Sequence, residues 1–182
     1  PCHPATLDTV WGVRGIITGF DARPSAYGFY IQNTFAGGPQ GWTGVDVFTG
    51  ATNYNAAVPG TPTGGNLALG DSVVIYGTTQ EFPAINGETE IEGPDAVQST
   101  NDIIIRKING GNALPAAKVG TTTQFNWVPG ISAATAEPWE GCLVRINGPM
   151  HVARVQTGAG LFANNFLVVS NANTADSVMV DG

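Results

Sequence analysis

Residues 10–48 read VWGVRGIITGF (10–20), YGFYIQNT (27–34) and TGVDVF (43–48), with turns between them. All three segments are rich in Val, Ile, Phe, Tyr and Thr, and Gly, Pro, Asn or Asp bound them, a composition typical of short strands. In the last segment Val45 and Val47 alternate with polar Asp46, so one side faces a core. We therefore expect three consecutive antiparallel strands whose edges are covered by later strands.

Two more strands are predicted after a long loop rich in Gly and Pro. The first covers residues 71–82 and carries Gly77 in its middle, which is typical of a bulge or tight bend in a barrel. The pair Asn86-Gly87 predicts a hairpin, so residues 89–92 return antiparallel to it. Five strands in this order predict an all-β fold with a five-stranded OB-like Greek-key barrel.

The C-terminal part repeats the pattern of the opening three strands. CLVRINGPMHVARV (142–155), NNFLVVSN (164–171) and DSVMVDG (176–182) parallel the opening segments. We expect a second, partial OB-like β unit of three strands, with an edge open to self-association. The residues predicted to line that edge are Leu143, Val144, Ile146, Phe166, Val168, Val178 and Val180.

Three regions follow from these patterns. Residues 1–108 form the predicted OB-like barrel domain, 109–136 an extended connector, and 137–182 the partial second unit. The partial unit has three expected outcomes: it extends the first sheet, it belongs to a longer repeat protein, or another copy completes its pairing.

The charge of the chain limits its partners. Fourteen acidic and seven basic residues give a net charge of −7, and charged residues make up only 12%. The seven cations are scattered, whereas nucleic-acid binding draws on clustered Lys and Arg. We therefore expect neither a nucleic-acid partner nor an anionic lipid surface, and no run of 18 apolar residues predicts a membrane span.

The two cysteines, Cys2 and Cys142, leave two alternatives open. A disulfide between them would close a loop of about 140 residues and contribute roughly 5 kcal/mol in the chain-entropy model. The other alternative is a buried thiol at Cys142 and a separate thiol at the terminus. Low Lys content and an even cysteine count favour an exported protein, located outside the cell or on its surface.

No catalytic, metal-binding or cofactor-binding pattern is recognised in the sequence. Glu88, Glu90 and Glu92 share one strand face by period two, and we interpret them as a solvated face of an acidic protein. His151 lies in a predicted strand, and no nucleophile elbow or phosphate loop occurs. The sequence therefore predicts a protein that is not an enzyme and has no metal and no cofactor.

Exposed aromatic rings on OB-like strands are candidates for ligand contact. Tyr30, Trp42 and Phe48 lie on or near the predicted second and third strands, and we predict a stacking site there. The other tryptophans are interpreted as packing anchors. These are Trp11, Trp127 and Trp139.

Several of these segments together resemble a known group of modules. The segments are RGIITGF, YGFYIQN, GVDVFTG, LALGDSVVIYGTTQEF, TEIEG and EPWEGCLVRINGP. They resemble OB-fold modules of secreted bacterial endonuclease/exonuclease/phosphatase-type enzymes and of other large exported proteins. The resemblance covers about residues 10–92 and 137–155. In that family the hydrolytic chemistry belongs to a separate domain, so the resemblance implies no catalytic residue in this chain.

These observations favour a non-catalytic exported structural or interaction module. We expect it to associate with copies of itself or with adjacent domains through sheet edges, as in an extracellular assembly or filament. One alternative, implied by the resemblance, is the nucleic-acid-binding accessory module of a secreted nuclease. A second alternative is a carbohydrate-binding module that uses exposed aromatic rings.

Overall fold

A computed structural model describes residues 8–21, 27–34, 36–50, 67–82, 88–93, 103–128, 131–132, 135–155, 166–170 and 177–180. Its first six strands are β1 (Thr9–Asp21), β2 (Tyr27–Gln32), β3 (Gly44–Gly50), β4 (Ser72–Phe82), β5 (Glu88–Glu92) and β6 (Ile104–Asn109). The later elements are β7 (Lys118–Gly120), β8 (Trp127–Val128), β9 (Ile131–Ser132), η1 (Glu137–Trp139), β10 (Val144–Ile146), β11 (Met150–Val155), β12 (Phe166–Ser170) and β13 (Ser177–Val180).

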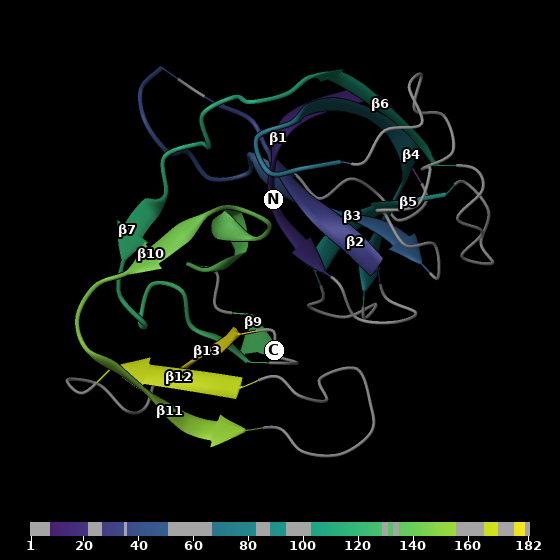
Figure 1. The fold of residues 1–182 in the computed structure, drawn as a ribbon. Helices are drawn as coiled ribbons and strands as arrows, with labels where there is room; N and C mark the ends of the chain where they lie inside the picture. The colour runs from purple at the N-terminus through teal and green to yellow at the C-terminus, as the bar shows by residue number, and fades with distance from the viewer. Residues whose placement is uncertain are drawn as a thin grey trace.

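The first five strands close into the barrel that the sequence predicts. The sheet runs β1-β2-β3-β5-β4-β6, and β1 also pairs with β4, which closes the ring (Figure 1). All pairings in the ring are antiparallel except that of β3 with β5. β6 is an additional strand that pairs with the first half of β4. The all-β, OB-like fold class is therefore confirmed.

The barrel interior is filled by aliphatic side chains and one aromatic ring. The core residues are Ile17, Phe29, Ile31, Val47, Leu67, Val73, Ile75, Ile91, Ile103 and Ile105. They alternate along each strand with residues that point outward, as the period of two requires. Gly77 lies where β4 passes from β1 and β6 to β5, and a Cβ there would collide with the carbonyl of Glu92. The predicted bend at this glycine is thus a place of close backbone approach.

The connector between the two predicted units contributes strands. β7 pairs in parallel with β10, so Val144 and Ile146 belong to a small separate sheet and do not continue into β11. The second larger sheet has the order β11-β12-β13-β8-β9. Its β11-β12-β13 meander is antiparallel, as the sequence pattern predicts.

The expectation of an unpaired border at β13, the third strand of that meander, was wrong. An open border was expected after the third strand, but β13 pairs in parallel with β8 through Val178 and Trp127. β8, which lies within the predicted connector, therefore pairs with the outer border of β13. Among the described strands of this sheet, the two border strands are β11 and β9. The sequence pattern does not indicate β8, because a strand of two residues carries no periodic signal.

Candidate functional surfaces

The three predicted ligand-contacting aromatic residues lie around the outer side of β2 and β3. Tyr30 pairs with Asp46, and Phe48 pairs with Gly28. Both rings therefore lie on the outer face of the sheet, whereas the buried Phe29 lies on the inner face. Both are half-buried. Trp42 lies in the preceding loop with 53% of its surface exposed and a φ of 62°. Tyr30 and Phe48 thus share one side of the sheet with a carboxyl group between them.

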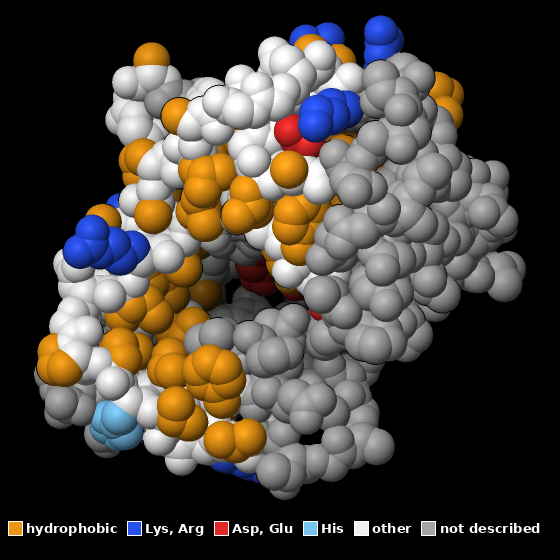
Figure 2. Space-filling model, viewed as in Figure 1, with side chains coloured by type: hydrophobic (Ala, Val, Ile, Leu, Met, Phe, Trp, Pro, Cys, Tyr) orange, Lys and Arg blue, Asp and Glu red, His pale blue; other side chains and the backbone are white. Residues whose placement is uncertain are grey.

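That side of the barrel carries a cluster of carboxyl groups. Asp46 pairs with Glu90 across β3 and β5, and Gln80 of β4 donates a hydrogen bond to Glu90. Glu90 and Glu92 are only 5% and 2% exposed. The interpretation of this face as solvated was therefore wrong. Figure 2 shows acidic side chains at the floor of a hollow between the barrel and the C-terminal sheet.

Burial shifts the titration of three of these acids. Burial, followed by the nearby carboxylates Glu88, Glu90 and Asp21, raises the pKa of Asp46 well above its usual range. Burial raises the pKa of Glu90 to about 7, against the opposing effect of its hydrogen bond from Gln80. Burial and then Glu137, Glu88 and Glu81 raise the pKa of Glu140 to about 8. Protonated carboxyl groups therefore persist here close to neutral pH.

Glu140 belongs to a segment that packs against the outer side of the barrel. In the segment formed by residues 137–143, which we call the clasp, the Pro138 carbonyl accepts a hydrogen bond from the Trp42 N–H at 2.6 Å. The Leu143 N–H donates to Oε1 of the buried Gln32 at 2.9 Å. The clasp therefore joins the outer side of the barrel through backbone groups.

Two glycines permit the close approach of the clasp. Gly141 has a φ of 63°, and its backbone lies directly against Gly44 of β3. A Cβ at Gly44 would overlap the Gly141 carbonyl. The sequence pattern did not identify this contact, because it joins residues far apart in the chain.

Of the two alternatives for the cysteines, the disulfide is not supported. Cys142 carries a free thiol in the clasp, and its Sγ lies 3.6 Å from the Thr43 hydroxyl. Cys2 lies outside the described residues. The alternative, a thiol at Cys142, is what the structure has.

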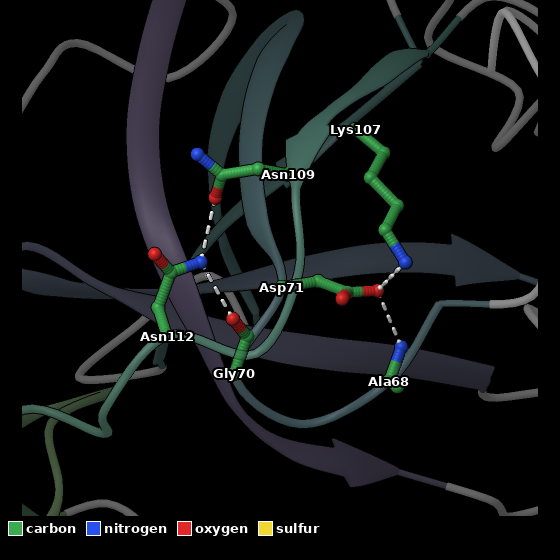
Figure 3. Close-up of polar contacts among 6 residues, drawn as sticks. All are labelled: Ala68, Gly70, Asp71, Lys107, Asn109 and Asn112. Carbon is green, nitrogen blue, oxygen red and sulfur yellow. Dashed lines mark hydrogen bonds and ion pairs between the residues drawn. The ribbon is translucent and has the colours of Figure 1, made fainter.

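A polar network fixes the entry into β4 (Figure 3). The Asp71 carboxylate is 3% exposed, receives the Ala68 N–H at 2.8 Å and lies 2.7 Å from the Lys107 ammonium. The Asn112 amide donates to the Gly70 carbonyl at 2.8 Å. The network ties the loop before β4 to β6 and to the chain after it.

Trp11 was interpreted as a packing anchor, and that interpretation was wrong. Trp11 is 77% exposed on the outer side of β1, with its ring edge-on to Tyr76 at a centroid distance of 6.1 Å. Trp139 is half-buried, with the Lys118 ammonium 4.9 Å from its ring centroid. The side chain of Trp127 lies outside the described part of the chain.

The residues predicted to line the association edge are distributed over several elements. Val144 and Ile146 lie in β10, while Phe166, Val168 and Val178 are half-buried in the inner strands β12 and β13. Leu143 belongs to the clasp, and the side chain of Val180 is not among those described. The exposed border of the sheet is β11 instead, where every residue after Met150 is exposed.

Two kinds of feature are absent from the described residues. They contain no helix long and apolar enough to cross a membrane. No three His, Cys, Asp or Glu side chains among them are grouped so as to hold a metal ion.

Comparison with known proteins gave no relative. No protein-family model, no curated protein and no solved structure matches this chain. The functional argument therefore depends on the molecule's own surfaces.

Proposed function

We propose that this chain is a non-catalytic, exported structural module that associates with copies of itself through the free border of β11, as a subunit of an extracellular assembly. The observation that carries the proposal is the exposure of β11. Val152 and Val155 are 53% and 56% exposed, and β11 pairs with β12 alone among the described strands. A strand that is paired along one border only offers the backbone N–H and C=O groups of its other border to another strand.

The composition of β11 supports pairing with a second copy. Its sequence MHVARV contains no carboxylate, although the whole chain has a net charge of −7. Two β11 strands can therefore approach without the repulsion that opposes contact elsewhere on the surface. An antiparallel pair across a twofold axis would place the two copies of Val152 side by side.

The resemblance to modules of large exported proteins supports the location outside the cell. Low charge and the sequence's abundance of Gly and Pro are consistent with it. The pairing of β11 with β12 shifts register between Val152 and Arg154, which interrupts the regular strand. We therefore expect the contact with a second copy to span only a few residues. The resulting association is expected to be weak for one contact and to strengthen when many copies assemble.

Light scattering coupled to size-exclusion chromatography, over a series of protein concentrations, tests this proposal. The wild-type chain is expected to increase in mass with concentration, and Val152→Glu is expected to remain monomeric because two glutamates would face each other. Val119→Glu is the matched control, since Val119 is 47% exposed on β7 in a different sheet. A wild-type chain that is monomeric at every concentration, or a Val119→Glu variant that loses association equally, would contradict the proposal.

A further inference from the structure

The outer side of β1, β4 and β6 presents a row of exposed rings and aliphatic groups. Trp11 pairs with Tyr76, and Tyr76 pairs with Ile104 on its other side, so the three side chains lie in one line across the sheet. Trp11 is 77% and Ile104 47% exposed. We call these three residues the platform.

The backbone around Trp11 is built to hold its ring outward. The pairing of β1 with β4 shifts register between Trp11 and Val13, and Gly12 between them has a φ of 74°. This is a β-bulge at a position that favours glycine, and bulges re-aim the neighbouring side chain. Tyr76 then supports the ring edge-on at an interplanar angle of 73°.

Two arginines lie in the next row of the same side. Arg14 and Arg106 both pair with Val74, from opposite edges of β4, and both are exposed. The strands that carry them are two spacings apart, about 10 Å. Lys107 alternates to the other side and binds Asp71, as Figure 3 shows. The two guanidinium groups are therefore presented beside the platform.

The described strand segments that form this side contain no acidic residue, and the nearest ones in sequence among the described residues are Asp8 and Asp71, which precede β1 and β4. Residues 9–16, 72–78 and 104–109 contain no Asp and no Glu, although the chain has fourteen of them. The opposite side holds the buried cluster around Asp46 and Glu90. Charge is thus segregated within the barrel strands, and the platform side favours the approach of anions.

We propose that the platform, with Arg14 and Arg106, binds an acidic polysaccharide whose sugar rings bear carboxylates. The flat apolar face of a sugar ring packs on Trp11, and its carboxylates take the paired N–H groups of the arginines. The single Trp11 ring and the two arginines provide enough contacts for a few sugar residues of such a polysaccharide. A single-stranded nucleic acid stacks successive bases on several exposed rings, whereas the platform presents one strongly exposed ring, that of Trp11.

This inference does not depend on self-association, because the platform and β11 lie on different sheets. Affinity electrophoresis in native gels containing polygalacturonate, followed by calorimetric titration with oligogalacturonate, measures it. The wild-type chain is expected to be retarded by polygalacturonate and not by its methyl-esterified form, which has the same rings without the charge. Salt is expected to weaken the binding.

Matched variants separate the ring from the charge. Trp11→Ala and the double variant Arg14→Gln/Arg106→Gln are each expected to lower the affinity by about tenfold or more. The controls are Leu114→Ala, at an exposed apolar side chain outside the three strands, and Arg145→Gln/Arg154→Gln, at two exposed arginines on β10 and β11. Both controls are expected to bind as the wild type does.

Three results would overturn the proposal. They are no retardation of the wild-type chain by polygalacturonate, equal binding to the esterified polymer, and equal loss in the control variants. Oligothymidylate is titrated in parallel. If it binds more tightly than oligogalacturonate and loses affinity in the same variants, the ligand is a nucleic-acid strand and the polysaccharide assignment is wrong.

Discussion

β2 of the barrel and β12 of the C-terminal sheet have similar sequences and similar positions, yet they are buried to different degrees. Each is an inner strand with two antiparallel neighbours. Phe29 and Ile31 of β2 are 0% and 1% exposed, whereas Val169, at 3%, is the one buried residue of β12, and Phe166 and Val168 remain half-buried. The barrel closes through the pairing of β1 with β4, so its apolar residues surround one core. The strand sequence is thus not enough: closure of the sheet decides how much apolar surface is removed from water.

The largest expected effect tests this difference in burial directly. Ile75→Ala in the barrel core is expected to lower the free energy of unfolding by about 4 kcal/mol, because it leaves a cavity in a close-packed interior. Val169→Ala, at the 3% exposed valine of β12, is expected to cost about 2 kcal/mol. Urea unfolding followed by circular dichroism measures both. An equal or larger cost at Val169 would mean that the open sheet is as well packed as the barrel.

The contact between the clasp and the barrel is the next target. Gly44→Ala is expected to cost about 3 kcal/mol, because the added Cβ overlaps the Gly141 carbonyl and forces the clasp away. Limited proteolysis is expected to cut the variant faster within residues 135–143. Gly37→Ala is the control, since its Cβ would meet only the Gln40 amide at 3.9 Å. Unchanged stability and protection in Gly44→Ala would show that the clasp is not held against β3.

A smaller effect is expected from the ion pair at the start of β4. Lys107→Met removes the partner of a buried carboxylate, so the free energy of unfolding is expected to fall by about 2 kcal/mol. Arg106→Met removes the neighbouring cation, which is exposed, and is expected to change stability by about 0.5 kcal/mol or less. Thermal unfolding compares the two. Equal effects of the two variants would mean that net charge matters here and the buried pair does not.

The smallest effect is a dependence of stability on pH. The pKa values of Asp46, Glu90 and Glu140 are raised in the folded chain, the last two to about 7 and about 8. Such groups bind more protons folded than unfolded. Their stabilising contribution is complete below about pH 4.5 and is lost as the pH rises through the folded pKa values.

Thermal unfolding from about pH 5 to about pH 9 is therefore expected to show decreasing stability for the wild type. Glu140→Gln is expected to flatten the upper part of this profile, because the amide stays neutral. The effect is modest, since Glu140 is only half-buried and water screens it. Asp8→Asn, at an exposed carboxyl outside the cluster, is expected to leave the profile unchanged. A wild-type profile that rises with pH would contradict the raised pKa values.

The barrel was predictable because its signals are local. Alternation in β3, the Asn86-Gly87 pair, which lies outside the described residues, and Gly77 together indicate the strands and their order. The site residues were less predictable. Period two correctly placed Glu88, Glu90 and Glu92 on one face, but it does not show which later segment covers that face. The exposure of Trp11 had one local signal, the glycine that follows it in the strand.

The sequence by itself determined the all-β class, the strand order of the barrel and the acidic balance of the chain, because alternation, turn residues and charge are properties of neighbouring residues. Only the tertiary structure decided which faces meet water. It buries Glu90 and Glu92, aligns Trp11 with Tyr76 and Ile104, and pairs β13 with β8, while β11 pairs with β12 alone among the described strands. Each of these contacts joins residues distant in sequence, and such pairing depends on how the whole chain packs.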